Sequence, residues 1–169
     1  MTAPMTDSAD WRRATGARGL LRIFNEAGLL ETADVLVAQR LTELAKEPDE
    51  QVALAIAFVV RAVRGGSVCV DLAAIPQQVG AADLPWPDPA QWRAAVSGSA
   101  LVADPTVLHL DGGLLYLDRY WIEECRVAED VRALAAATRS GPAAELHRLF
   151  PTPHAEQRAA AAVAPPRAL

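Results

Sequence analysis

Histidine and cysteine are the residues that most often hold metal ions, and this sequence contains three of the first and two of the second. The histidines, His109, His147 and His154, lie far apart and share no metal-ligand spacing with a cysteine or an acid. Cys69 and Cys125 are too few for a disulfide framework in a chain of this length, and they suit free, buried thiols in a reducing compartment. The sequence therefore predicts no metal site.

Paired carboxylates for acid–base chemistry are a second possibility, and one segment is rich in acids. The acids of this segment are Glu123, Glu124, Glu129 and Asp130. Arginines stand three or four residues away, the spacing of ion pairs on a solvated helix face, each worth about 0.2–0.5 kcal/mol. No Ser, Thr or Cys lies in a nucleophile motif, and neither Gly65–Gly66 nor Gly112–Gly113 is followed by the Lys-Ser/Thr of a phosphate loop. The sequence therefore predicts no catalytic residue.

Three aromatic side chains are candidates for contact with another protein, because aromatic residues are enriched at binding hot spots. Trp86 lies between prolines in a long loop, which favours a surface anchor over a core position. Tyr120 and Trp121 fit two interpretations: they pack a neighbouring hairpin into a helical layer, or one of them faces a partner. We therefore predict Trp86, Tyr120 and Trp121 as interface residues, with core packing left open for the last two.

Length and composition place these residues in one globular domain. The chain has 169 residues, of which 51% are hydrophobic and 22% charged, and its formal net charge is −5. Proteins that neutralise nucleic-acid phosphates concentrate positive charge, so direct DNA binding as the main task is disfavoured. The N-terminus has no apolar signal segment, and the longest apolar run, Val52–Val60, is far shorter than the ~20 residues that span a bilayer. We therefore expect a cytoplasmic protein that does not bind membranes.

The segment from residue 105 to residue 137 organises the predicted fold. Two short apolar runs flank Asp111-Gly112-Gly113, and because glycine tolerates positive φ, they predict a β-hairpin over 107–117. A strand over 67–71 can join this hairpin in a three-stranded sheet. A long helix with Asp118 as its cap follows directly. The residues that its pattern turns inward are Tyr120, Trp121, Val127, Val131 and Leu134.

Helices are predicted on both sides of this segment. Those that precede it span Asp10 to about Ala27, Thr32–Lys46, Asp49–Arg64 and Pro89–Val96, the last with Asp88 as its N-cap. The helix over 49–64 is apolar almost all round, which is typical of burial on several sides. Residues 76–89 are predicted as a loop, and further helices cover 143–149 and begin near 153. The predicted fold class is α+β, mostly α, a helical domain with a small antiparallel β element.

Four segments in order carry a resemblance to a known family. They are Gly66–Ile75 (GSVCVDLAAI), Leu114–Val131 (LLYLDRYWIEECRVAEDV), Leu146–Pro151 (LHRLFP) and Glu156–Ala164 (EQRAAAAVA). Their order and distances resemble the N-terminal region of the alpha subunit of exodeoxyribonuclease V, the RecD helicase family. The resemblance covers most of the chain from about Leu29 onward.

The resemblance implies a non-catalytic part of a DNA-repair complex. The family's parent subunit would be an ATP- and Mg²⁺-dependent 5′→3′ DNA helicase acting in double-strand-break repair and recombination. Its N-terminal domain would dock to the gamma subunit (RecC) and through it reach the beta subunit, with DNA contacted only through the complex. Gln157 matches the family's glutamine ahead of the P-loop and is a vestigial adenine-contact candidate. We therefore expect no cofactor in this chain itself.

The family's P-loop has no counterpart in this sequence, so the resemblance also implies a domain layout. Residues 1–9 are expected to be a disordered N-terminus and residues 10–150 a RecD-like accessory domain. Residues 151–169 are expected to be a remnant of the helix that leads into a missing ATPase domain, which would make this a truncated subunit.

A small winged-helix-like nucleic-acid-binding module is the alternative, because helices followed by a hairpin can form a winged helix. A wing that contacts phosphates needs Arg or Lys, and this hairpin has neither between Pro105 and Asp118.

Overall fold

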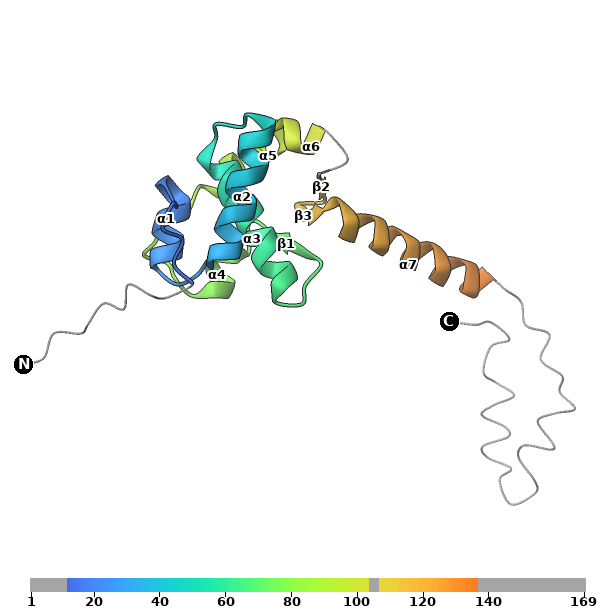
Figure 1. Cartoon of the computed structure of the whole chain (residues 1–169). Helices are drawn as coiled ribbons and strands as arrows, with labels where there is room; N and C mark the ends of the chain where they lie inside the picture. The colour runs from blue at the N-terminus through green and yellow to red at the C-terminus, as the bar shows by residue number, and fades with distance from the viewer. Residues whose placement is uncertain (1–11, 104–106, 137–169) are drawn as a thin grey trace, which may run out of the picture. The chain divides into compact units, whose positions relative to one another are not determined.

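The computed structural model describes residues 12–103 and 107–136 (Figure 1). The chain divides into two compact units, Met1–Trp121 and Ile122–Leu169. The elements described are α1 (Gly19–Glu26), α2 (Thr32–Ala45), α3 (Glu50–Arg64), β1 (Cys69–Asp71), α4 (Ile75–Val79), α5 (Pro89–Gly98), α6 (Ala100–Ala103), β2 (Leu108–Asp111), β3 (Leu114–Leu117) and α7 (Asp118–Ala136). The predicted fold class, mostly α with a small antiparallel sheet, is confirmed.

Helix α3 is the centre of the first unit, and it contacts α1, α2, α5, β1 and β3 (Figure 1). Asp49 caps its start by accepting a hydrogen bond from the Gln51 N–H at 2.8 Å. Every side chain from Val52 to Val59 is buried. A helix buried on all sides needs neighbours on all sides, which is why the other elements of the unit surround it.

An aromatic cluster fills the core beside α3. It consists of Phe24 of α1, Phe58 of α3, Trp86, and Trp92 of α5, with ring centroids 4.5–6.4 Å apart. The indole N–H of Trp92 donates to the Gln51 carbonyl at 2.8 Å, so this fully buried ring leaves no polar atom unsatisfied. The cluster ties α1 and α5 to α3.

The sheet forms as the sequence predicts. β2 and β3 make an antiparallel hairpin, and β1 pairs antiparallel with β3, so the strand order is β1-β3-β2. Gly112 and Gly113 have φ of +56° and +94°. These positive values confirm that the turn uses the conformational freedom of glycine. Leu115 of β3 and Leu108 of β2 are fully buried, so one face of the sheet closes the core.

Two predicted boundaries on the N-terminal side of the hairpin are wrong. The helix predicted from Asp10 starts at Gly19 instead, because Gly19 takes φ +51° and a Cβ there would meet the Glu50 carboxylate, whose oxygen accepts the Leu20 N–H at 3.2 Å. The loop predicted over 76–89 begins with the short helix α4, in which Pro76 occupies the first turn. Ile75 of this helix is buried and extends the core.

The prediction for α7 is partly wrong. The helix begins at Asp118 as expected, but Val127, Val131 and Leu134 are 61%, 52% and 46% exposed instead of turned inward. No residue of α7 is buried. The helices predicted over 143–149 and from about 153 lie outside the described residues.

Candidate interaction surfaces

The candidate metal-binding residues form no cluster in the part of the chain that the structure describes. Within residues 12–103 and 107–136, no group of three or more His, Cys, Asp or Glu side chains is placed to hold a metal ion. Cys69 and Cys125 are half-buried free thiols, less buried than the sequence suggested. His147, His154 and Gln157 lie outside the described residues.

His109, the one histidine that the structure describes, belongs to a joint between the hairpin and α7. Its Nε2 lies 2.6 Å from an Asp118 carboxylate oxygen, and its ring stacks on Trp121 with centroids 5.4 Å apart. Tyr116 meets the same indole edge-on at 5.1 Å. Asp118 thus binds the hairpin at the start of the helix, and Trp121 is held by two rings of the sheet.

The three predicted interface aromatics therefore occupy different environments. Trp86 is half-buried in the aromatic cluster, and its indole N–H donates to the Ala81 carbonyl at 2.7 Å, so the expectation that it anchors on the surface and not in the core is wrong. The Trp86 ring packs against Phe58 of α3, with ring centroids 5.3 Å apart. Tyr120 and Trp121 are half-buried, and Trp121 shows the predicted packing against the hairpin. A partner contact by any of the three stays a prediction.

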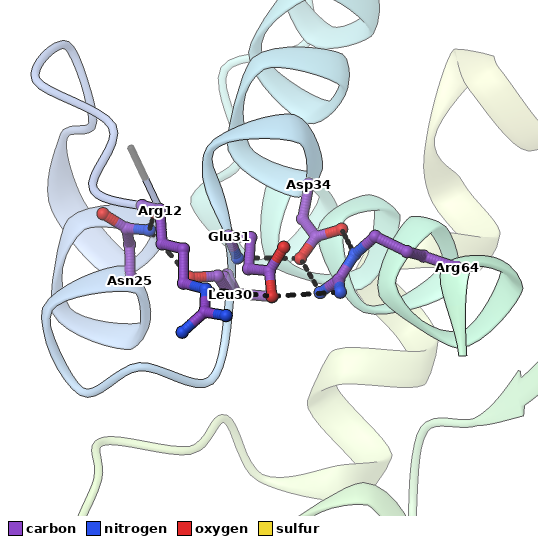
Figure 2. A network of polar contacts seen from close by, with 6 residues as sticks. All are labelled: Arg12, Asn25, Leu30, Glu31, Asp34 and Arg64. Carbon is purple, nitrogen blue, oxygen red and sulfur yellow. Dashed lines mark hydrogen bonds and ion pairs between the residues drawn. The ribbon is translucent and has the colours of Figure 1, made fainter. Parts of the chain in front are cut away.

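A polar network that the sequence analysis missed fastens the start of α2 to the end of α3 (Figure 2). The Asp34 side chain is completely buried, and the Arg64 guanidinium donates to both of its carboxylate oxygens, at 3.3 and 3.0 Å. Arg64 also pairs with Glu31 at 3.1 Å. Hydrogen bonding to Asp34 raises the pKa of Arg64 above its ordinary value, although burial opposes the shift. This guanidinium therefore stays charged at every physiological pH.

The same network continues into the N-terminal segment through Asn25 (Figure 2). Its amide nitrogen donates to the carbonyls of Leu30 and Arg12, at 2.7 and 2.9 Å, and its carbonyl oxygen accepts the Ala14 N–H at 2.9 Å. The sequence signal for part of this network was the acidic pair Glu31 and Asp34 at a helix start, which forms a capping box. The long-range partner, 30 residues away, left no local signal.

A groove of about 650 Å³ lies beside this network, between the end of α3, the strand β1 and α4. Phe58, Ile75 and Val79 contribute apolar lining, and the Arg61 guanidinium lies 6.0 Å from the centroid of the Phe58 ring. Among the strands that the structure describes, β1 pairs with β3 alone and lies at an edge of the sheet. The polar part of the lining includes Glu31, Arg64 and Asp71.

Two helix faces in the described residues expose large apolar side chains. On α2, Leu36, Val37 and Leu44 are 55%, 39% and 63% exposed, and we call these three residues the α2 face. On α7, the set defined by Val127, Val131 and Leu134 is the α7 stripe. Contiguous exposed apolar residues mark interaction sites more often than single ones do. These faces are the strongest candidates for protein contact.

Comparison with known proteins identifies the family of this chain. The family model described as the N-terminal domain of the RecBCD enzyme subunit RecD matches residues 26–116, more than half of the 169 residues. The chain belongs to this family. The predicted resemblance to the N-terminal region of RecD is thereby confirmed.

Individual relatives agree with the family match. The chain is 58% identical over 152 residues to the RecBCD enzyme subunit RecD of Mycobacterium tuberculosis, in both strains CDC 1551 / Oshkosh and ATCC 25618 / H37Rv. It is 57% identical over 145 residues to the subunit of the same name from Mycolicibacterium smegmatis. These alignments cover 89% and 86% of this chain but 26% of each relative. The chain thus spans about a quarter of the length of the curated relatives that it matches.

Only one of the two exposed helix faces lies within the residues that match the RecD N-terminal family model. The α2 face lies inside residues 26–116, as do the groove and most of the aromatic cluster, whereas the α7 stripe lies beyond residue 116. None of the helices described is both long and apolar enough to cross a membrane.

Proposed function

We propose that this chain is the non-catalytic N-terminal region of a RecD-like subunit of exodeoxyribonuclease V and that it docks to the gamma subunit, RecC. The observation that carries the proposal is the RecD N-terminal match over residues 26–116. The relatives are named as subunits of the RecBCD enzyme, so the expected partners are RecC and, through it, RecB in the cytoplasm. ATP and Mg²⁺ would act in other parts of the intact subunit.

The geometry of the described residues supports a docking role. Among the described residues no group of three His, Cys, Asp or Glu side chains is placed to hold a metal ion, and the first unit forms a well-packed scaffold around α3. The α2 face projects three large apolar side chains from that scaffold, within the family-matched residues. The hairpin has no Arg or Lys to contact phosphates, which disfavours the winged-helix alternative. We therefore assign the α2 face as the surface that meets RecC.

A co-purification experiment tests this proposal. The full chain is mixed with RecC from the same organism at low salt, and the complex is resolved by size-exclusion chromatography. We expect co-elution, and we expect Leu44→Glu to weaken it at least ~10-fold because a carboxylate replaces the most exposed apolar side chain of the α2 face. Leu44 is 63% exposed, so the substitution should leave the urea midpoint of the chain unchanged.

The matched control adds the same charge elsewhere. Gln77→Glu places a carboxylate on the exposed surface of α4 and should leave the RecC complex intact. Failure of the unmodified chain to bind RecC would refute the proposal. An equal loss of RecC affinity in the Leu44 and Gln77 variants would show that the α2 face is not the surface that binds RecC. DNA-stimulated ATP hydrolysis by the chain above a buffer control would refute its non-catalytic part.

A further inference from the structure

We propose that the α7 stripe binds an amphipathic helix of a partner protein whose own apolar stripe is flanked by Lys or Arg. This site is distinct from the α2 face, and it does not depend on which protein carries the helix. All residues that define it lie in the second unit, Ile122–Leu169, and within the described part of α7.

The spacing of the α7 stripe is that of a helix–helix seam. Val127, Val131 and Leu134 are separated by four and three residues, the alternation that keeps side chains along one line of a helix facing a second helix. Ala135 lies beside this line and is small enough to let another backbone approach closely. Three exposed branched side chains in one line present a continuous apolar ridge to a partner.

The charges around the stripe indicate the chemistry of the partner. At about 100° per residue, the exposed acids Glu124 and Asp130 lie within about 70° of the line of the stripe, whereas Arg126 and Arg132 lie more than about 100° from it. A helix that packs on the stripe therefore meets carboxylates at its flanks, and these two guanidinium groups point elsewhere. Basic flanking residues are complementary to this rim, because opposite charges at the flanking positions select the partner in helix pairs.

The position of Glu124 argues against a second copy of this chain as the occupant. Glu124 lies seven residues before Val131 and so stands about 20° from it around the helix, at the edge of the stripe. Parallel pairing of two copies would bring the two Glu124 carboxylates together beside the apolar seam, where like charges oppose association. A Lys or Arg from a different helix satisfies the same carboxylate.

Peptide binding to the full chain tests the proposal. The probes are two fluorescein-labelled synthetic helices of about 21 residues with the same leucine seam, one flanked by lysine and the other by glutamate. Fluorescence anisotropy should show binding of the lysine-flanked peptide, at least ~10-fold weaker binding of the glutamate-flanked one, and weaker binding of the first as salt is raised. Val131→Glu should lower affinity for the lysine-flanked peptide at least ~10-fold. The double variant Glu124→Lys/Asp130→Lys should reverse the preference between the two peptides.

A matched control and a stability measurement distinguish docking on the stripe from a change in the fold. Ile122 is 41% exposed but points away from the stripe, so Ile122→Glu should leave peptide affinity unchanged. Val131→Glu should leave the urea midpoint of the chain unchanged, because the side chain is exposed. Equal affinity for both peptides, no binding of either, or equal loss in the Ile122 variant would overturn the proposal. A lowered urea midpoint in the Val131 variant would also overturn it, because the chain itself would then cover the stripe.

Discussion

Replacing Arg64 by methionine should destabilise the fold far more than the same change at an arginine whose ion pair is mostly exposed. The substitution keeps most of the aliphatic stem but removes the hydrogen bonds to Asp34 and the ion pair with Glu31 (Figure 2). Breaking a buried ion pair by removing one partner costs about 3–5 kcal/mol, because the remaining charge is buried without compensation. The Asp34 side chain is 0% exposed, but that of Arg64 is 40% exposed and reaches water, which reduces the expected cost to about 2–3 kcal/mol.

Urea unfolding of the full chain measures this cost. Asp34→Asn, alone and combined with Arg64→Met, completes a double-mutant cycle, and we expect a coupling free energy of about 1–2 kcal/mol. The control is Arg40→Met, which removes a 2.9 Å pair with Glu43 whose side chains are 65% and 71% exposed, and it should change stability by less than about 0.5 kcal/mol. A coupling energy no larger than the effect of Arg40→Met would refute the reasoning that burial makes the Arg64 network strong.

The pKa of Arg64 also predicts how this cost depends on pH. A base whose pKa is raised on folding contributes stability at every pH below its unfolded pKa, and the contribution is lost only as the pH rises through the folded value. Because the pKa of Arg64 is raised from an already very basic value, the cost of Arg64→Met should be constant between about pH 6 and pH 9. A cost that fell steadily with rising pH in that range would contradict this linkage.

Two further predictions concern the core and the hairpin. Phe58 is 1% exposed and its ring meets three other aromatic rings, so Phe58→Ala should lower the free energy of unfolding by about 3–5 kcal/mol in urea titrations followed by tryptophan fluorescence. Gly113 has φ +94°, so Gly113→Ala should cost about 1–2 kcal/mol. Gly98→Ala is its control: Gly98 has no positive φ, and a Cβ there meets nothing within 4 Å, so this change should be neutral or slightly stabilising. An equal loss of unfolding free energy at the two glycines would show that the positive φ of Gly113 is not the reason for its effect on stability.

The parts of the fold that the sequence predicted are those with strong local signals. Helix α3 has a capping aspartate at Asp49, an apolar surface all round and a glycine pair at its end, and its observed start differs from the prediction by one residue. The hairpin has two short apolar runs and a turn that only glycine adopts easily. The pairing of β1 with the hairpin was also predicted, because a two-stranded ribbon needs a third strand to be stable.

The errors arise where tertiary contacts override local pattern. The loop composition around Trp86 indicated a surface position, but the Phe24 and Phe58 rings lie 4.5 and 5.3 Å from the indole and draw it into the core. The first helix starts late, at Gly19, where φ is +51° and where the Leu20 N–H donates to the carboxylate of Glu50, 30 residues away. The Asp34–Arg64 contact joins residues 30 positions apart, and no spacing rule within one helix reveals it.

The α7 stripe shows most clearly what a sequence pattern contains and what it omits. The periodicity of Val127, Val131 and Leu134 correctly indicates that one line of the helix is apolar, but the same periodicity serves a core helix and a docking helix equally well. A core helix and a docking helix differ in whether the chain's own residues cover the apolar line. In this structure the three side chains of the α7 stripe are about half exposed or more. The acids beside the stripe then indicate what kind of helix binds it. A charged rim selects among partners, which a helix packed into its own protein's core does not require. The interpretation of α7 as a core helix was therefore wrong for a physical reason: apolar periodicity fixes the face of a helix, whereas charge and burial identify its partner.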